Sequence, residues 1–416
     1  MKKTIMSLAV AATLAGSAFA NEGGLPDGIP HLDHVFLIMM ENHGYSQIRD
    51  NPNAPFINEY ARTANLATNF FAIGHPSLTN YLEVVGGSNF GVQSDNDPDW
   101  HNAGCIPSLQ SGVANTDNPP SPSVCPIAGV GRDAATPAKD TVNEISNPGE
   151  VLNNIDGVQS IPAAYTSGKT IGDQLVAFGK RWKSYQESLP ASGADRVNYS
   201  DGFYTNNTNF GTITPALTPP LSQGDVVKLY AAKHNPFVYF RAVQEGHNPG
   251  NSLKNSVGFD GESGLYADLR SGNVPALAFI APNQCNDQHG RGNAGAFCNY
   301  DPLSDGSQAG LNPALIQRGD QTVEKLVNAI KASPAWKDGQ NAIVLMWDEN
   351  DYSQVPNTNQ VMLIVDTSYG AQHVVSSERY NHFSVLKTLE AGFRLPCLNH
   401  ACDRDVKVMN DLFSHR

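Results

Sequence analysis

The 416-residue chain has few basic residues and, after its first twenty residues, no long apolar run. It contains 27 Lys and Arg against 40 Asp and Glu, a formal net charge of −13. We expect no nucleic-acid partner, because so acidic a chain would repel a polyanion. We also expect no transmembrane segment, because a helix needs roughly 18 apolar residues to cross a bilayer. An anionic substrate would therefore need local positive charge, such as a metal ion.

The first twenty residues, MKKTIMSLAVAATLAGSAFA, have the pattern of a secretory signal peptide. Two lysines precede an apolar core, which ends in the small-residue pattern Ala18-Phe19-Ala20. We therefore expect a secreted or periplasmic protein after cleavage near Ala20. Residues 21–416 are expected to form a single domain, because α/β enzymes often carry this length in one domain with long loops.

Cysteine is scarce, and its spacing argues against structural zinc. The six cysteines show no C-x-x-C spacing, which such sites usually use. An even number in an exported chain favours disulfides instead. We expect three pairs of sequence neighbours to be bonded: Cys105 with Cys125, Cys285 with Cys298, and Cys397 with Cys402.

Five apolar runs predict strands: residues 34–40, 236–240, 276–282, 342–347 and 361–365. Runs without alternation are expected where helices cover both faces of a sheet. Apolar residues at helical spacing predict helices at 319–334 and 382–393. Alternating strands and helices predict an α/β fold with a mainly parallel sheet. Residues 93–165 and 186–225, rich in Asn, Pro, Gly and Ser, are expected to be long surface loops near a binding site.

Polar side chains follow three of these strands at the point where each strand ends. They are Glu41, Asn42, Asp287, His289, Asp348 and Glu349. Because ligands bind beyond the carboxyl ends of strands in open α/β sheets, we expect these side chains to lie together. Gathered carboxylates repel one another, and a divalent cation usually offsets that repulsion. One such end alone is equally well explained by a solvated turn, whereas three together favour a site.

The segment GHPSLTNYLEVVGG, residues 74–87, predicts a short helix that begins near Ser77. A serine there could attack phosphorus, because free amides and the helix dipole stabilise negative charge at a helix N-terminus. The alternative is that Ser77 or Thr79 simply caps the helix, a common role of these residue types. Taken alone, the segment favours the cap.

Six segments resemble, in order and spacing, the bacterial and fungal phosphoesterase family. They are MENHGYSQI, HPSLTNYLEVVGG, HNPFVYF, PNQCNDQH, WDEND and YNHFSVLKTLEAGFRLP, and the resemblance spans residues 34–396. This family includes secreted acid phosphatases and a class of phospholipases C, and it belongs to the alkaline phosphatase superfamily. The resemblance implies an alkaline-phosphatase-like three-layer α/β/α sandwich with a metal ion at the strand ends.

The resemblance also implies roles for individual residues. It implies four metal ligands: Glu41, Asn42, Asp348 and Glu349. Zinc is the first choice, with Mn, Ca or Mg as alternatives that the oxygen-rich donor set also suits. Ser77 stands at the place of a nucleophile that also contacts the metal, while His289 and His382 are expected to bind phosphate or transfer protons. We assign substrate or phosphate binding to four further residues: His75, Asn80, His247 and Asp287.

These features together predict an exported, metal-dependent phosphoester hydrolase that forms a phosphoserine. We expect phospholipase C activity on a phospholipid, because the long loops could hold a lipid, with acid phosphatase activity as the alternative. The segment ENHGYS differs from the ENRSFD of the larger phospholipases and is closer to the smaller secreted enzymes. An alternative hypothesis from another functional class is a non-catalytic exported protein that binds metal or phosphate. The oligomeric state stays open.

Overall fold

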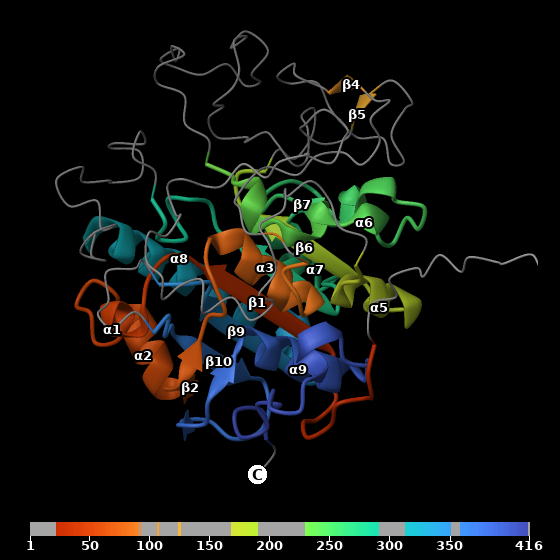
Figure 1. Cartoon of the computed structure of the whole chain (residues 1–416). Helices are drawn as coiled ribbons and strands as arrows, with labels where there is room; N and C mark the ends of the chain where they lie inside the picture. Colours follow the sequence, from red (N-terminus) through yellow and green to blue (C-terminus); the bar gives the residue numbers. More distant parts are fainter. Residues whose placement is uncertain are drawn as a thin grey trace, which may run out of the picture.

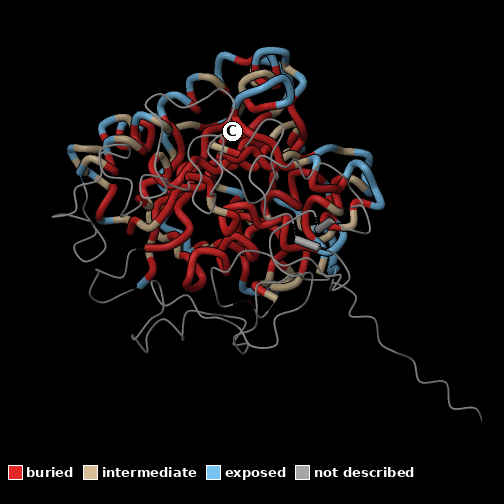
Figure 2. Tube along the Cα trace, turned by 90° about the horizontal axis from the view of Figure 1, so that it is seen from above, coloured by how far each residue is buried: buried red, intermediate tan, exposed pale blue. Residues whose placement is uncertain are grey.

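The computed structural model of the chain describes residues 22–90, 92, 106–107, 124–125, 168–189, 229–290, 313–350 and 358–414. The expected signal peptide lies outside the described residues, as do most of the two expected long loops. Most buried apolar side chains of the described residues belong to one continuous cluster. Figure 2 shows these buried residues in the interior, with the exposed residues on the outer turns of the trace.

An eight-stranded sheet lies at the centre of the described part of the chain (Figure 1). Its strands are β1 (His34–Met40), β2 (Asn65–Ala67), β6 (Trp182–Gln186), β7 (Ser256–Val257), β8 (Leu277–Ala281), β9 (Asn341–Trp347), β10 (Leu363–Thr367) and β11 (Val375–Ser376). Their order is β11-β2-β10-β9-β1-β8-β6-β7. Strand β10 runs antiparallel to both of its neighbours, and the other neighbouring pairs are parallel. Two small sheets pair β3 (Phe70–Phe71) with β12 (Tyr380–Asn381), and β4 (Ile106–Pro107) with β5 (Val124–Cys125).

Helices cover both faces of this sheet. They are α1 (Tyr45–Ile48), α2 (Pro55–Thr63), α3 (Ser77–Gly86), α5 (Ile171–Ala177), α6 (Arg241–Glu245), α7 (Leu265–Ser271), α8 (Pro313–Ala332) and α9 (His382–Phe393). Short 3-10 turns are η3 (Ala232–His234), η4 (Pro236–Tyr239), η5 (Leu253–Asn255), η7 (Ala335–Lys337) and η8 (Asn399–Cys402). In Figure 1, α3 and α9 pack together in front of the sheet, while α8 packs against α2 and α7.

Every residue of β8, β9 and β10 is buried, which requires cover on both faces. The predicted fold class, a three-layer α/β/α sandwich with a mainly parallel central sheet, is confirmed. Among the described residues, no helix combines the length and the apolar character that a membrane crossing needs.

All but one of the predicted elements overlap an observed element of the same type, although α8 begins six residues before the predicted 319 and β10 is shifted by two residues from 361–365. The predictions at 34–40 and 382–393 have the same bounds as β1 and α9. The strand predicted at 236–240 is wrong, because this run forms the 3-10 turn η4. A fully buried apolar run does not distinguish a strand from a buried helical turn. Pro236 also lacks the N–H group that a central strand would donate.

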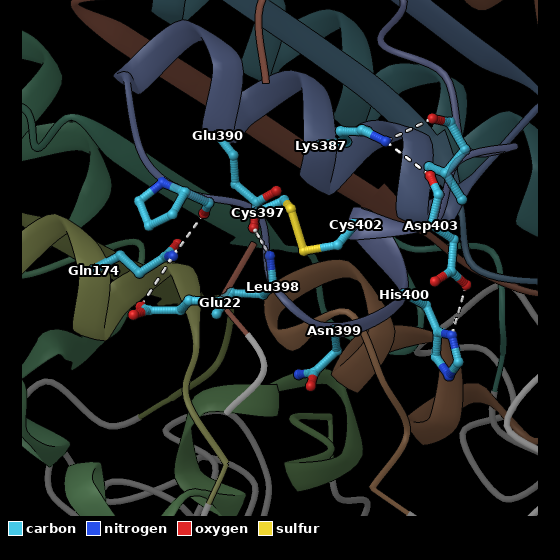
Figure 3. The surroundings of a disulfide bond; sticks show 12 residues. Glu22, Gln174, Lys387, Glu390, Cys397, Leu398, Asn399, His400, Cys402 and Asp403 are labelled. Atoms are coloured by element: carbon cyan, nitrogen blue, oxygen red, sulfur yellow. Dashed lines mark hydrogen bonds and ion pairs between the residues drawn. A yellow bond between two sulfur atoms is a disulfide. The ribbon is translucent and has the colours of Figure 1, made fainter. Parts of the chain in front are cut away.

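Helix α3, which begins at Ser77, is held at its other end by the loop around a disulfide (Figure 3). The structure joins Cys397 to Cys402, with their Cα atoms 5.2 Å apart. Asn399 Nδ2 in this loop donates to Gly86 O at 2.7 Å, and the backbone N of His400 donates to Gly87 O at 2.9 Å. These bonds occupy carbonyl groups that the end of a helix leaves without partners inside the helix.

The other two expected disulfide pairings stay predictions. Cys285 is disulfide-bonded. Its expected partner, Cys298, lies outside the described residues, and so do Cys105 and the side chain of Cys125.

The end of α3 gives a test of this packing. Gly87 has a φ of +72°, and an added Cβ would lie 2.4 Å from Leu398 O. We expect Gly87→Ala to lower the free energy of unfolding by more than the roughly 1–2 kcal/mol that the left-handed conformation alone costs. Denaturant unfolding provides the measurement.

Gly179→Ala is the matched control for that substitution. Gly179 has a φ of +73°, but no described atom lies within 4 Å of an added Cβ. The difference between the two variants therefore isolates the contact between the end of α3 and Leu398. Equal losses of stability in both variants would show that this contact is unimportant.

Candidate active site

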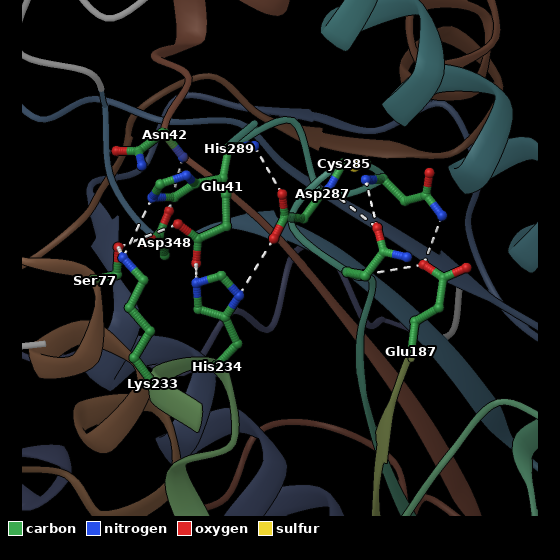
Figure 4. Close-up of polar contacts among 12 residues, drawn as sticks. Glu41, Asn42, Ser77, Glu187, Lys233, His234, Cys285, Asp287, His289 and Asp348 are labelled. Atoms are coloured by element: carbon green, nitrogen blue, oxygen red, sulfur yellow. Dashed lines mark hydrogen bonds and ion pairs between the residues drawn. The ribbon is translucent and has the colours of Figure 1, made fainter. Parts of the chain in front are cut away.

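Residues that follow three parallel strands meet at one edge of the sheet (Figure 4). Their backbones are joined directly, because Glu41 N donates to Asp287 O at 2.9 Å and Asp348 N donates to Met40 O at 3.0 Å. The side chains of Glu41, Asp287, Asp348 and Glu349 are fully buried there. The structure thus brings together the three strand ends that the sequence indicated.

Ser77 lies among these carboxylates as the first residue of α3. Its hydroxyl oxygen is 3.1 Å from Glu41 Oε2 and 3.2 Å from Glu349 Oε1, so its proton is donated to either carboxylate. The N-cap of α3 is Pro76, and Thr79 Oγ1 donates to Pro76 O at 2.8 Å. Ser77 is therefore not the helix cap, and its hydroxyl is turned towards the acidic cluster.

Glu41 is held by a tyrosine and a histidine. Tyr81 OH donates to Glu41 Oε1 at 2.5 Å, and His234 Nε2 lies 3.0 Å from the same oxygen. The other ring nitrogen of His234 lies 3.3 Å from Asp287 Oδ2. The rings of Tyr81 and His234 stack, with centroids 5.1 Å apart. His234 therefore links the end of β1 to the loop after β8.

Glu349 is held by His75 and Asn80, two residues of the segment around Ser77. His75 Nδ1 lies 2.8 Å from Glu349 Oε2, and Asn80 Nδ2 donates to the same oxygen at 3.1 Å. Asn80 also donates to Gly74 O and accepts from the backbone N–H groups of Ile73 and Gly74. These bonds use the full capacity of an amide side chain. In the structure Asn80 therefore holds Glu349 in place, and its role in substrate binding stays a prediction.

The electrostatics of the cluster follow from burial and mutual repulsion. Burial raises the pKa values of Glu41, Asp287 and Asp348 well above their usual range. Repulsion adds to this, as Asp348 raises the pKa of Glu41 and Glu349 raises that of Asp348. The ammonium group of Lys233 has the opposite effect, because it lowers the pKa values of Glu41, Asp287 and Asp348.

Two expected site histidines lie elsewhere. His382 is fully buried, with Nε2 3.4 Å from Trp347 O and its ring against Phe70. Burial lowers the pKa of His382 to about 3, so its imidazole is neutral at ordinary pH and supports the end of β9. The side chain of His247 is 76% exposed and lies 3.4 Å from Glu245 Oε2. The structure therefore does not bring His247 into the cluster.

Asp287 and His289 do lie in the cluster, although a carboxylate is unsuited to binding phosphate directly. Asp287 Oδ1 accepts a hydrogen bond from the backbone N of His289 at 2.7 Å. Its other oxygen faces His234. Asp287 therefore holds the backbone of His289 and the ring of His234, and phosphate binding by His289 stays a prediction.

Two residues of the site, Lys233 and His234, were missed in the sequence. They lie in η3, immediately before the run that was predicted as a strand. Lys233 Nζ lies 3.3 Å from Ser77 Oγ and 3.3 Å from His289 Nε2 (Figure 4). A signal was present for His234, because it opens HNPFVYF, one of the six segments that carry the family resemblance.

The donor set fits a divalent cation in its chemistry. Glu41, Asp348 and Glu349 supply buried carboxylate oxygens, and Asp348 Oδ2 accepts no hydrogen bond from the described residues. Asn42 adjoins them through its backbone N, which donates to Asp348 Oδ1 at 3.0 Å. Within the described ranges, however, no three His, Cys, Asp or Glu side chains are arranged as a metal site. Metal binding therefore remains a prediction.

Sequence comparison identifies the family of the chain. A profile of the phosphoesterase family matches residues 47–299 and 308–396. The chain is 24% identical to a phosphatidylinositol-3-phosphatase from Mycobacterium tuberculosis, over 96% of this chain and 92% of that protein. It is 24% identical to an acid phosphatase from Aspergillus fumigatus and 23% identical to a phosphate-repressible acid phosphatase from Penicillium chrysogenum. These matches cover 62% and 88% of this chain but 36% and 60% of the fungal proteins.

Solved structures also show similarity at low identity. A protein in the alkaline phosphatase superfamily from Vibrio parahaemolyticus has a TM-score of 0.44 and 11% identity, over 92% of this chain and 72% of that chain. The C-terminal periplasmic domain of EcEptC from Escherichia coli, in complex with Zn, has a TM-score of 0.36 and 11% identity, over 96% and 91%.

Proposed function

The chain belongs to the phosphoesterase family, which makes it a hydrolase of phosphoester bonds, and on that premise we propose that it is a phosphomonoesterase with Ser77 as its nucleophile. The position of the Ser77 hydroxyl, between Glu41 and Glu349 at the start of α3, carries this proposal. The relatives named above are phosphatases, which favours monoesters as the substrate class.

In the first step, Ser77 Oγ attacks phosphorus and its proton passes to a carboxylate. Glu41 and Glu349 both suit this role, because the Ser77 hydroxyl already faces an oxygen of each. The Oγ–P bond forms as the bond from phosphorus to the alcohol breaks. The departing alcohol oxygen then takes the proton that the carboxylate holds.

In the second step, water attacks phosphorus and the Oγ–P bond breaks. One proton of the water returns to Ser77 Oγ, and the remaining hydroxyl stays on the released phosphate. Helix α3 favours both steps, because the positive end of its dipole faces the negatively charged phosphoryl group. Tyr81 and His234 keep Glu41 in place throughout.

We also propose that Glu41, Asp348 and Glu349, with Asn42 beside them, hold a divalent cation, zinc being the first choice. When bound, such an ion supplies Lewis-acid stabilisation of charge on the phosphoryl group. The repulsion among these buried carboxylates supports the assignment.

Phospholipase C activity is not carried into this proposal. The prediction of a phospholipid substrate depends on the long loops at 93–165 and 186–225, and most of their residues lie outside the described residues. Cleavage on the glycerol side of a phospholipid therefore becomes one outcome of the substrate test.

The substrate class is tested with purified protein and three compounds. We expect inorganic phosphate from 4-nitrophenyl phosphate, because it is a soluble monoester. Phosphatidylinositol 3-phosphate in vesicles is included because a relative is named for that activity. Release of phosphocholine from phosphatidylcholine, without phosphate from either monoester, would overturn the proposal in favour of a phospholipase C.

The nucleophile is tested by Ser77→Ala. We expect hydrolysis to fall by at least about 10³-fold, because the covalent route is removed. A phosphoenzyme trapped by acid quenching and located by mass spectrometry should be found in the parent protein and be absent from the variant. Thr79→Val is the matched control, because it removes a hydroxyl from the same turn of α3 that bonds only to Pro76 O among the contacts described. A Ser77→Ala protein of near-normal rate would refute the role of Ser77.

Metal binding is tested without relying on activity. We expect elemental analysis to find a divalent metal, and chelation to lower the midpoint of thermal unfolding because the carboxylates then repel one another. Asp348→Asn should reduce the metal content. Asp268→Asn should not, because it alters a buried carboxylate that pairs with Lys183 outside the cluster. A protein that contains no divalent metal, and whose midpoint of thermal unfolding does not change on chelation, would contradict the proposal.

A further inference from the structure

Lys233 places a positive charge against the oxygen of Ser77. Its Nζ lies 3.3 Å from Ser77 Oγ, and the residue is 9% exposed. Figure 4 shows the side chain reaching from η3 up to Ser77, with the ammonium group between Ser77 and His289. A lysine this buried is uncommon, since an ammonium group loses hydration when it leaves water.

The second contact of Lys233 shows how this group is oriented. His289 Nδ1 lies 2.9 Å from Gly290 O, a carbonyl that can only accept. The proton of a neutral His289 is therefore on Nδ1, and Nε2 carries a lone pair. That lone pair faces Lys233 Nζ at 3.3 Å and accepts a hydrogen bond from it. The backbone of Gly290 thus fixes His289, and His289 fixes the ammonium group.

Three buried carboxyl groups lie close enough to Lys233 to interact with its charge. The ammonium group of Lys233 lowers the pKa values of Glu41, Asp287 and Asp348. Each of these carboxyl groups also has its own polar partner. Tyr81 donates a hydrogen bond to Glu41, for example, and the backbone N of Asn42 donates one to Asp348. The ammonium group of Lys233 also meets Ser77 Oγ, the atom that would form the bond to phosphorus.

We propose that Lys233 is a further catalytic residue, whose ammonium group stabilises the Ser77 oxygen as it gains and loses the phosphoryl group and favours doubly charged monoesters over singly charged diesters. This inference rests on the proposed function. When Ser77 loses its proton to Glu41 or Glu349, the negative Oγ is beside a fixed cation. When the Oγ–P bond later breaks, the same cation meets the departing oxygen until water returns its proton.

The preference for monoesters follows from charge. A phosphomonoester carries two negative charges above its second pKa and a diester carries one, so a fixed cation at the nucleophile interacts more strongly with the monoester. A preorganised group of this kind typically changes the rate by about 10²–10³-fold. Removing the charge should therefore affect the monoester reaction more than the diester reaction.

The experiment compares kcat/KM for 4-nitrophenyl phosphate and bis(4-nitrophenyl) phosphate, which share a leaving group. We expect Lys233→Met to lower the value for the monoester by about 10²-fold and that for the diester by less than about 10-fold. Lys233→Arg keeps the charge and should keep more of the monoester preference. The preference is the ratio of kcat/KM for the monoester to that for the diester. If this ratio fell equally in Lys233→Met and Lys233→Arg, or did not change in Lys233→Met, the inference would be overturned.

Two controls keep the test decisive. Lys183→Met removes a lysine that bonds to Asp268 Oδ2 at 2.5 Å and to Ser263 O at 3.0 Å, so it should lower stability and leave the preference unchanged. If thermal unfolding shows that Lys233→Met is not folded, Lys233→Arg is compared with Lys233→Gln. The inference then requires a higher monoester preference in Lys233→Arg, which keeps the charge, and equal preferences would overturn it. An active Ser77→Ala protein would refute the proposed function, whereas an inactive one with an unchanged preference in Lys233→Met would refute only the role of Lys233.

Discussion

The need to stabilise four buried carboxylates at one edge of the sheet determines the rest of the site. Taking an ionised carboxylate out of water costs several kcal/mol unless hydrogen bonds or opposite charge offset the loss. Here each has its own partners: Tyr81 and His234 for Glu41, His75 and Asn80 for Glu349, the backbone N of Asn42 for Asp348, and the backbone N of His289 for Asp287. These partners come from α3, η3 and two strand ends, so the cluster also joins those elements together.

The fold supplies the fixed positions that this cluster requires. Parallel strands β1, β8 and β9 are neighbours in register, so the residues that follow them emerge at the same edge. Helix α3 brings Ser77 to that edge, and the loop of the Cys397–Cys402 disulfide holds its opposite end at Gly86 and Gly87. The proposed nucleophile is therefore positioned by a helix restrained at both ends, which suits a reaction that depends on placement more than on bond strain.

Short apolar runs were the reliable part of the sequence, with one instructive failure. Strand β1 and helix α9 have the predicted bounds, because their apolar residues extend over the whole element. The run at 236–240 has the same apolar character, yet it forms η4. Lys233 and His234 lie in η3, directly before this run, and no local pattern indicates that this turn faces the site. His247 is exposed and outside the cluster, because a polar motif carries no information on whether its loop turns towards the site.

The sequence by itself determined the class of fold, the acidic residues at three strand ends, and the serine that opens α3. It could do so because apolar periodicity and strand ends are local features of the chain. Only the tertiary structure decided which polar side chains meet. Lys233 and Ser77 are 156 positions apart, and Glu349 and Ser77 are 272 apart, yet each pair is in contact. Such contacts depend on the order of strands in the sheet, and a single sequence does not encode that order in any local pattern.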